Sequence, residues 1–296
     1  MIKYQFLRFP GDKQKAVTLS YDDGVVEDLR FSDVITNAGL KCTFNLNSNL
    51  IRKNGITDQQ VREKLLDRGH EVAVHGYLHT ALSSQRPIEG IKEVLNGRLD
   101  LEERFDCIIR GMAYPAKKLD EFDNGTSYEI IRNYLKNLGI VYARTVGATN
   151  YDFKLPDDWY RWMPSVHHSS PDVFKCIDEF LSYQFTKPKF APRLFYMWGH
   201  TYEFERKNNW NLLDKICEKL GGHDDIWYAT NMEIYEYVNA YYSLVHSADA
   251  SKVYNPTLHT IWFVTNSDTY VIKPGETINI KPLEEKWKTL GVSDNI

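Results

Sequence analysis

The sequence lacks several features that would assign a protein to a class at once. Its 296 residues include only four cysteines, Cys42, Cys107, Cys176 and Cys217, none at the Cys-x-x-Cys spacing. This pattern indicates neither a disulfide framework nor a thiolate zinc site. No apolar run approaches the roughly 20 residues that span a bilayer, and residues 1–15 lack the apolar core of a signal peptide. We therefore expect a cytoplasmic protein without a membrane partner.

An excess of charge of one sign is also missing. The formal net charge is −4, which implies neither nucleic acid nor an anionic membrane as a partner. Hydrophobic residues make up 43% of the chain and charged residues 26%, as in ordinary globular proteins. Aromatic residues are abundant at 14%, including 19 Tyr and 7 Trp. Sugar rings stack on such side chains, but so do the side chains of protein cores, so this is only a hint of a carbohydrate ligand.

Segments of strand length alternate with segments of helix length over about the first 245 residues. Strands are expected over 17–24, 41–46, 71–75, 107–114, 140–144 and 193–198. Helices are expected over 25–38, 58–68, 87–105, 127–138, 171–183, 211–220 and from about 231 to 245. This alternation predicts parallel strands with crossover helices, closed as a barrel or nearly so.

Two segments interrupt this rhythm. Residues 145–170 form a long irregular stretch with aromatic side chains, and such a stretch inside a compact domain tends to be functional. From about residue 247, short β-patterns alternate with turn residues. We therefore predict a barrel domain over 1–246 and a small β appendage over 247–296 that packs on the barrel.

Polar side chains stand at the ends of three expected strands. Asp22 and Asp23 end the first strand, His75 and His79 follow the third, and His200 follows the strand over 193–198. Carboxyl ends of parallel strands meet at one edge of the sheet, so these groups should converge if the loop after His75 begins as a helical turn. Adjacent strand residues point in opposite directions, so the two aspartates should have different tasks.

Each of these signals is weak by itself. An Asp-Asp-Gly sequence is also typical of a turn, and two histidines four residues apart occur by chance in a chain with nine histidines. Together, however, two histidines and one aspartate with an open position form a common catalytic zinc site. The remaining carboxylate and histidine could then supply the base and the acid that hydrolysis requires.

The motifs resemble those of polysaccharide deacetylases, the NodB-like domain of carbohydrate esterase family 4. Residues 20–24 read Ser-Tyr-Asp-Asp-Gly, close to the family's first motif, and residues 75–79 read His-Gly-Tyr-Leu-His, with Gly76 where Ser or Thr is usual. Residues 111–116 are similar to a variant of the third motif, and residues 196–200 to the last. The resemblance covers roughly residues 15–245 and implies a distorted (β/α) barrel.

The resemblance also implies roles for the residues at the strand ends. Asp23, His75 and His79 would hold a divalent metal, zinc in the first place, with cobalt, nickel or manganese as alternatives. Asp22 would be the base that takes a proton from metal-activated water. The implied activity is removal of acetyl groups from an acetylated oligo- or polysaccharide, as an N-acetyl amide or an O-acetyl ester.

Further roles follow from the same resemblance. His200 would be the acid that protonates the leaving group, and the backbone N–H of Ala116 would help to stabilise the oxyanion. Candidate substrate-binding side chains are the aromatic residues expected near the site, which are Tyr114, Trp159, Trp162, Trp198 and Tyr202.

The chain departs from the family pattern in two motifs. The arginine that usually orients the base would fall near Ala113, which has no charge, and Arg110 is the nearby alternative. The fourth motif has no clean match, and Asp157, Trp159 and Trp162 are candidates for it. These departures keep two alternatives open, namely a hydrolase of non-sugar amides and a carbohydrate-binding protein on a decayed enzyme scaffold.

Other polar residues nearby are expected to have no chemical role. His167 and His168 should form a solvated pair rather than a second metal site. Glu203 and Glu205, which follow His200, should be surface charges. The oligomeric state does not follow from these patterns.

Overall fold

The computed structural model describes residues 4–49, 53, 55–116, 119–145, 153–183, 191–265 and 268–281. The chain divides into two compact units. The larger unit consists of Lys15–Gln184 and Arg193–Tyr235, and the smaller unit of Met1–Gln14, Phe185–Pro192 and Glu236–Ile296.

The larger unit contains a curled parallel sheet. Its strands are β2 (Lys15–Asp23), β3 (Cys42–Leu46), β4 (Glu71–Val74), β5 (Gly111–Ala113), β6 (Tyr142–Arg144), β7 (Val166–His167), β8 (Arg193–Gly199) and β9 (Ile226–Tyr228). Their order is β6-β5-β4-β3-β2-β8-β7, with β9 paired to β2, and every pair is parallel. Within the described chain, β6 and β7 are the end strands, so the sheet is a (β/α) barrel left partly open.

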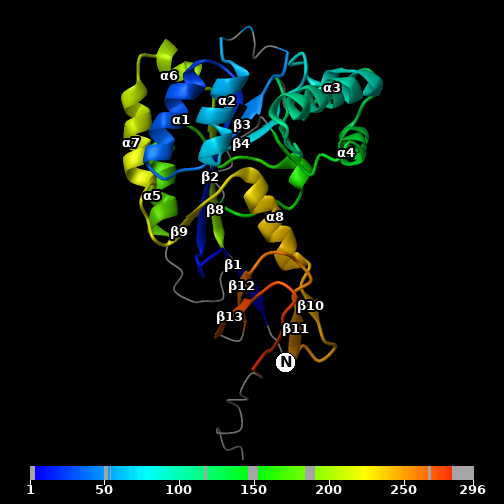
Figure 1. The fold of residues 1–296 in the computed structure, drawn as a ribbon, viewed down its shortest axis with the longest axis vertical. Coiled ribbons are helices and arrows are strands. Elements are labelled where there is room, and N and C mark those ends of the chain that lie inside the picture. The colour runs from blue at the N-terminus through cyan, green and yellow to red at the C-terminus, as the bar shows by residue number, and fades with distance from the viewer. Residues whose placement is uncertain are drawn as a thin grey trace, which may run out of the picture. The chain divides into compact units, whose positions relative to one another are not determined.

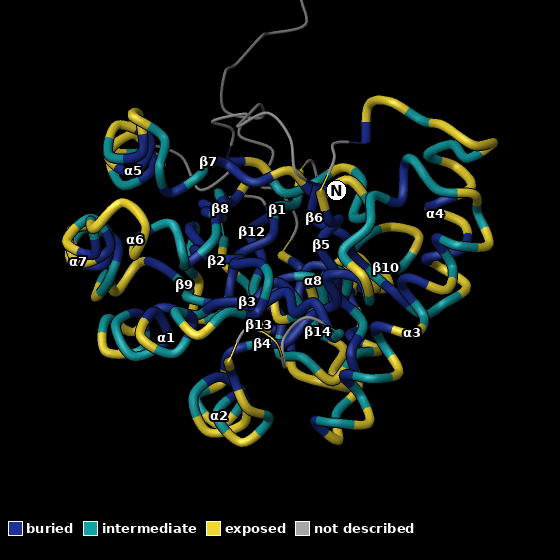
Figure 2. The backbone as a smooth tube through the Cα atoms, turned by 90° about the horizontal axis from the view of Figure 1, so that it is seen from above, coloured by how far each residue is buried: buried dark blue, intermediate teal, exposed yellow. Residues whose placement is uncertain are grey.

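Helices cover the outside of this sheet. They are α1 (Glu27–Asn37), α2 (Asp58–Lys64), α3 (Pro87–Phe105), α4 (Tyr128–Asn137), α5 (Val173–Ser182), α6 (Tyr202–Arg206) and α7 (Trp210–Leu220). Short 3-10 turns lie at Leu66–Arg68, Leu82–Ser84 and Trp159–Arg161, and α8 (Asn231–Tyr242) runs from the larger unit into the smaller one (Figure 1). Figure 2 shows the helices around the strands, with buried residues toward the sheet and exposed residues outward.

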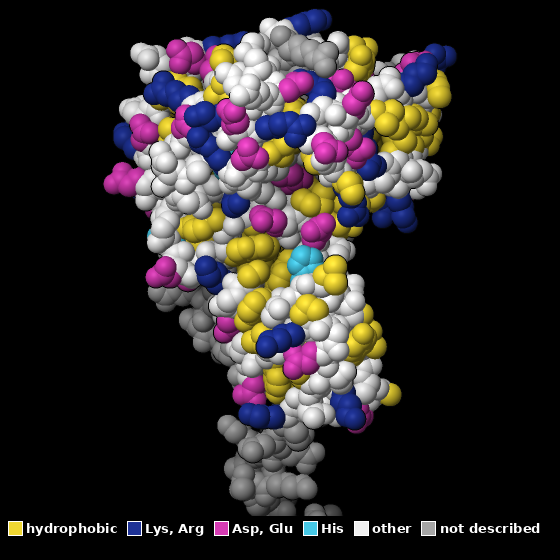
Figure 3. Space-filling model, viewed as in Figure 1, with side chains coloured by type: hydrophobic (Ala, Val, Ile, Leu, Met, Phe, Trp, Pro, Cys, Tyr) yellow, Lys and Arg dark blue, Asp and Glu magenta, His cyan; other side chains and the backbone are white. Residues whose placement is uncertain are grey.

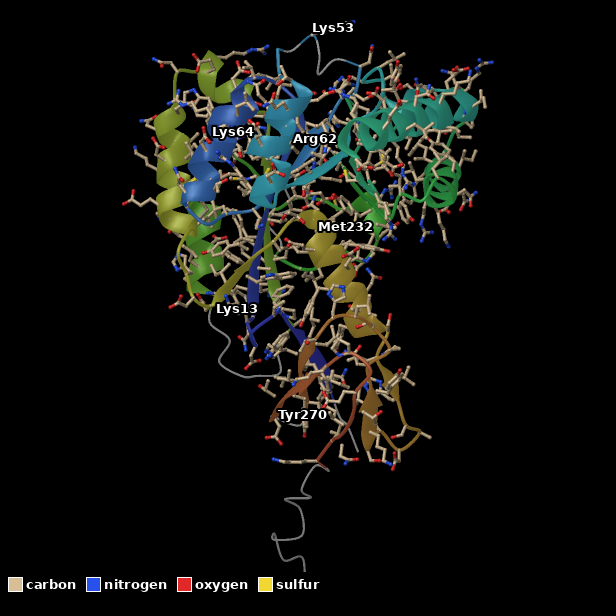
Figure 4. The ribbon with its side chains drawn as sticks, viewed as in Figure 1. Lys13, Lys53, Arg62, Lys64, Met232 and Tyr270 are labelled. Atoms are coloured by element: carbon tan, nitrogen blue, oxygen red, sulfur yellow. The ribbon has the colours of Figure 1, made fainter. Side chains whose placement is uncertain are left out.

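Local sequence explains where several of these elements begin and end. β2 is buried along almost its whole length, and beyond its first residues apolar side chains alternate with polar ones, which places the two kinds on opposite faces of the strand. Thr57 and Gln60 form a capping box at the start of α2. Arg62, labelled in Figure 4, donates from α2 to the carbonyl oxygens of Arg104 (2.6 Å) and Phe105 (2.9 Å) at the end of α3, where carbonyl groups lack helical partners.

Polar side chains inside the larger unit pair with one another. Glu71 accepts hydrogen bonds from the Tyr142 hydroxyl (2.6 Å) and from the backbone N–H of Met232 (2.9 Å), which is labelled in Figure 4. Asn231 donates to the Tyr196 hydroxyl oxygen (2.6 Å). These bonds satisfy buried polar atoms and fix the start of α8 against the strands.

The smaller unit is formed by two three-stranded antiparallel sheets, which confirms the β character predicted for the C-terminal segment. One sheet contains β1 (Gln5–Arg8), β12 (Ile261–Thr265) and β13 (Asp268–Ile272), and the other contains β10 (Val245–His246), β11 (Lys252–Tyr254) and β14 (Thr277–Asn279). β1 pairs with β12 so that Gln5 lies opposite Thr265. Nothing in the local sequence indicated this pairing of the two ends of the described chain.

Several predicted boundaries need correction. The helix over 87–105 is confirmed at both ends. The strand expected over 107–114 is limited to Gly111–Ala113, and the last long helix ends at Tyr242, because residues 245–246 form β10. The short elements β1, β7, β9 and α6, each of five residues or fewer, were not predicted.

The surface carries charges of both signs. On the face shown in Figure 3, Lys and Arg side chains are interspersed with Asp and Glu over the larger unit. Among the described helices, none combines the length and the apolar character that crossing a membrane requires.

Candidate metal and catalytic site

The carboxyl ends of β2, β4 and β8 bring together all five strand-end residues singled out in the sequence. Asp22 and Asp23 end β2, His75 follows β4 directly, and His200 follows β8. These strands belong to one parallel sheet, so their ends lie at the same edge. His79 reaches the same place from the loop after β4.

Asp23, His75 and His79 present three ligand atoms to one point. His79 Nε2 lies 3.2 Å from Asp23 Oδ1 and 3.2 Å from His75 Nε2, and His75 Nε2 lies 3.6 Å from Asp23 Oδ1. Tetrahedral zinc with bonds of 2.0–2.1 Å separates its ligand atoms by about 3.3 Å. The three atoms therefore fit a zinc-type ion.

A backbone contact orients one of these ligands. His75 Nδ1 lies 3.0 Å from the carbonyl oxygen of Ala113, which can only accept, so the Nδ1 proton is donated there. The lone pair of Nε2 then faces Asp23 and His79. A hydrogen bond of this kind is the usual way in which metal-binding histidines are held.

The backbone around the site is strained. Asp23 has φ 84°, His79 has φ 61°, and Gly76 has φ 80°. The loop after His75 is therefore not a helical turn, contrary to the sequence-based expectation. The two imidazoles converge because left-handed residues turn the chain back, and such residues are concentrated at functional sites.

Glu93, on α3, holds this loop. Its Oε1 accepts the backbone N–H of Leu78 (2.8 Å) and of Thr80 (3.0 Å), and the side chain is buried. A Cβ atom at Gly76 would lie 2.5 Å from the same oxygen. This contact, together with the positive φ, explains why glycine stands where Ser or Thr is usual in the motif.

Asp22 is oriented by two side chains that the sequence did not reveal. Arg144, at the end of β6, forms an ion pair with Asp22 Oδ2, and Asn45 donates to Asp22 Oδ1 (2.9 Å). Arg144 is completely buried, and its guanidinium lies 4.7 Å from the centre of the Trp198 ring. Arg144 therefore supplies the cation for which Arg110 was the alternative named from the sequence. Arg144 also stands at the end of a strand, so the rule that selected the other site residues could have found it.

Charge keeps both aspartates ionised. Burial raises the pKa of Asp22, but the Arg144 guanidinium and the nearby His75 and His200 outweigh it, so that pKa is lowered from its usual value. Burial also opposes ionisation of Asp23, yet the hydrogen bond from His79 and the charges of His75 and His200 lower its pKa to about 2. At neutral pH one carboxylate is available as a ligand and the other as a proton acceptor.

His200 faces both aspartates. Its Nε2 lies 4.0 Å from Asp22 Oδ2 and 4.0 Å from Asp23 Oδ2, and its Nδ1 lies 3.1 Å from Glu203 Oε1. Burial lowers the pKa of His200, but Glu203 and the two aspartates raise it above the usual value. Glu203 is thus not the simple surface charge that was expected. Asp157, the candidate for the fourth motif, is exposed.

The neighbouring histidine pair also differs from expectation. His168 is buried, with its ring packed against those of Tyr21 and Phe204, and burial lowers its pKa to about 3. His167 is half-buried and lies near His200. The two residues are therefore not a solvated pair.

Ala116 stands in a left-handed conformation with φ 63° and is exposed. Non-glycine residues adopt this conformation rarely, and often at functional sites. The role of its N–H toward an oxyanion remains a prediction.

The candidate aromatic residues fall into two groups. Tyr114 and Trp162 are 1% and 2% exposed and belong to the core, so contact with a substrate would require an exposure that they lack. Trp159 packs edge-on against Trp162. Trp198 and Tyr202 lie beside His200, with ring centres 5.8 Å and 5.1 Å from the imidazole, and are the two that the structure brings to the site.

Comparison with known proteins supports the resemblance that the motifs carry. The sequence profile of the polysaccharide deacetylase family matches residues 10–143. This segment extends from before β2 into β6 and contains Asp22, Asp23, His75 and His79, so the resemblance that the motifs predicted is confirmed there. Among curated protein sequences, none matches this chain.

Two solved structures show the same fold. A protein assigned as a polysaccharide deacetylase from Mycobacterium smegmatis is 17% identical with a TM-score of 0.56, over 82% of this chain and 96% of that one. A protein assigned to the same class from Pseudomonas aeruginosa is 12% identical with a TM-score of 0.50, over 77% of this chain and 92% of that one. These likenesses establish the polysaccharide deacetylase type of (β/α) barrel.

Proposed function

We propose that the protein is a metal-dependent hydrolase that removes acetyl groups from a carbohydrate, as an N-acetyl amide or an O-acetyl ester. The observation that carries this proposal is the cluster of Asp23, His75 and His79 at zinc-type spacing, with the ionised Asp22 and the imidazole of His200 beside it. The match of residues 10–143 to polysaccharide deacetylases supports the substrate class.

The residues of the chain divide the work of hydrolysis. A divalent ion held by Asp23, His75 and His79 would polarise the acetyl carbonyl and lower the pKa of water. Asp22 would take the proton of the attacking water, and its contacts with Arg144 and Asn45 hold it in one orientation.

The second half of the reaction needs an acid. His200 Nε2, which faces the aspartates, would protonate the departing amine or alcohol. The N–H of Ala116 would contribute to the stabilisation of negative charge on the acetyl oxygen. Trp198 and Tyr202 would contact the substrate beside His200.

The contact between Arg144 and Asp22 also weighs against a decayed scaffold. The absence of an arginine near Ala113 motivated that alternative, but a buried arginine from another strand forms the ion pair instead. Asp22, the proposed base, therefore has a cationic partner on a strand where the motif did not place one. Hydrolysis of non-sugar amides uses the same groups and is distinguished by the substrate assay.

Metal analysis and acetate release test the proposal together. Protein purified without chelator should contain about one divalent ion per chain, with zinc expected first and cobalt, nickel and manganese measured alongside. Acetate should be released from acetylated chitooligosaccharides or acetylated xylan. Asp22→Asn should lose this activity, whereas Asp157→Asn, a matched change at an exposed aspartate, should keep it.

Other outcomes would contradict parts of the proposal. Folded protein without metal and without acetate release would favour a binding protein. Turnover of small cyclic amides, with no release from acetylated sugars, would favour the non-sugar alternative. Full activity of Asp22→Asn would exclude Asp22 as the base.

A further inference from the structure

We propose that Glu203 is the positioning residue for His200: its carboxylate accepts a hydrogen bond from the Nδ1–H of His200 and thereby directs Nε2 at the reacting groups. The proposal rests on the proposed function, because it assigns a partner to the acid of that reaction. In the sequence, Glu203 looked like a surface charge three residues after His200.

The geometry around Glu203 is that of a fixed acceptor. Its Oε1 lies 3.1 Å from His200 Nδ1 and 3.4 Å from His167 Nε2. Its Oε2 lies 2.8 Å from Lys207 Nζ and 3.3 Å from Ser169 Oγ. Donors from three elements of the chain therefore hold the carboxylate beside the imidazole.

The surroundings of His167 indicate which of its ring nitrogens presents a proton to Glu203. The backbone N–H of Ser169 donates to His167 Nδ1 (3.1 Å), so this nitrogen carries a lone pair. The proton of the neutral ring is then on Nε2, which faces Glu203. His167, His168 and Glu203 also have a spacing that could hold a metal ion, but the protonated Nε2 of His167 and the ammonium of Lys207 disfavour that use.

Packing keeps Glu203 in place. It lies in the first turn of α6, and its backbone N–H donates to the carbonyl oxygen of His200 (3.1 Å). The next residue, Phe204, is completely buried and stacks on His168 and Trp210. The short helix is therefore anchored by its core side, while Glu203 faces the imidazole.

A carboxylate at Nδ1 has a specific effect on an acid at Nε2. It selects the tautomer and stabilises the imidazolium that delivers the proton. An amide in the same place would accept the Nδ1 hydrogen bond without the charge. Replacing the carboxylate by an amide should therefore lower kcat most for substrates whose leaving group needs a proton.

The experiment compares Glu203→Gln with Glu205→Gln, a matched change on the same helix at an exposed glutamate. Two substrates are used. An N-acetyl sugar has an amine leaving group that requires protonation, and 4-nitrophenyl acetate has a leaving group that departs as an anion. Glu203→Gln should lower kcat for the sugar by about 10–100-fold and change kcat for the aryl ester by less than about twofold. Glu205→Gln should change neither, and metal content should remain the same in both.

Two results would overturn the proposal. An equal loss on both substrates would mean that Glu203 is merely structural, and an unchanged kcat for the sugar would mean that it does not act through His200. A second metal ion per chain, lost in His167→Ala, would assign the cluster to metal binding instead.

A measurement without substrate separates this inference from the proposed function. Nitrogen-15 NMR of the imidazole groups in the metal-loaded protein should show His200 protonated at Nδ1, with the signal changed by Glu203→Gln and not by Glu205→Gln. If acetylated sugars are not hydrolysed but this signal is found, the proposed function fails and the positioning stands. If His200 carries its proton only on Nε2, the positioning fails whatever the activity.

Discussion

Arg144 offers a test at the scale of one residue, because it contacts Asp22 without belonging to the proposed metal ligands. In Arg144→Met, Asp22 would lose its buried counter-ion and one of its two orienting contacts. We expect kcat for acetate release to fall by about 100-fold, a loss typical of disturbed general-base catalysis, while the metal content stays near that of the unchanged protein.

Arg110→Met is the matched control, since Arg110 is the arginine that the motif comparison suggested. Steady-state kinetics and metal analysis of both variants show which of the two arginines Asp22 needs. A larger loss of kcat in Arg110→Met than in Arg144→Met would contradict the assignment.

Arg144→Met should also be less stable by about 3–5 kcal/mol, because a buried carboxylate is left unpaired. Activity is therefore compared at a temperature where both variants are folded.

Gly76 provides a second residue-scale prediction. Gly76→Ala should destabilise the protein for two reasons, the left-handed φ of 80° and the approach of the new Cβ to within 2.5 Å of Glu93 Oε1. Gly125→Ala is the control, because Gly125 has a similar φ of 75° but nothing within 4 Å of an added Cβ.

Urea unfolding measures the difference between these two glycine variants. The control should lose about 1 kcal/mol from backbone strain, and Gly76→Ala should lose at least about 1 kcal/mol more. Equal losses would show that the contact with Glu93 is relieved without cost.

The residues that the sequence could reveal are those with a motif. Asp22, Asp23, His75 and His79 stand in short patterns with fixed spacing, so their convergence was predictable. Arg144 lies on a different strand from Asp22 and has no fixed spacing to it. Glu203 lies only three residues after His200, but the five-residue helix that brings the two side chains together was too short to be predicted. The strand-end position of Arg144 makes it a candidate for the site, but its pairing with Asp22 depends on the strand order, which the sequence does not state.

At the scale of elements, α3 supports the loop that carries His79. Glu93→Gln would keep an oxygen for the N–H groups of Leu78 and Thr80 but lose the negative charge that strengthens both hydrogen bonds. We expect zinc affinity to fall by about 10–100-fold, as for other outer partners of metal ligands.

A competition titration with a zinc chelator measures this affinity. Glu89→Gln is the control, because Glu89 lies on the same helix and pairs only with Arg86 and Lys92 among the contacts described for it. An unchanged affinity in Glu93→Gln would mean that the loop does not need this anchor.

The long helices and their caps were predictable from periodicity and capping residues, as Thr57 and the bounds of α3 illustrate. The strand β7 has only two residues and therefore no periodicity from which it could be predicted.

At the scale of the whole molecule, Asp28 should make stability depend on pH. Its side chain is 1% exposed and accepts hydrogen bonds from Thr201 Oγ1 (2.5 Å) and from the N–H of Val25 (3.1 Å). Burial raises its pKa to about 8. The unfolded chain would release this proton near pH 4, so between about pH 4 and 8 the folded state binds more protons.

The contribution of Asp28 to the free energy of unfolding should therefore fall as pH rises through this window, by up to about 1.4 kcal/mol per pH unit, and level off above pH 8. Asp28→Asn should flatten this slope. Denaturant unfolding of both proteins from pH 4 to pH 9 gives the difference. A wild-type curve parallel to that of the variant would show that Asp28 is ionised in the folded protein.

The architecture of the larger unit was predictable and that of the smaller unit only in part. Strand–helix alternation implies a parallel sheet with few alternatives, which is why the barrel could be predicted from the order of the elements. Antiparallel strands separated by most of the chain follow no such rule. Gln5 and Thr265 carry no local mark of their pairing.

That pairing has a consequence for how the protein is made. β1 leaves the ribosome well before its partner β12, which is more than 250 residues behind it in the sequence. At 5–20 residues per second, β1 waits roughly tens of seconds before the sheet can form. During this interval the edge of β1 is open to other chains, so yield in the cell should depend on whether a chaperone covers β1 until β12 has been made.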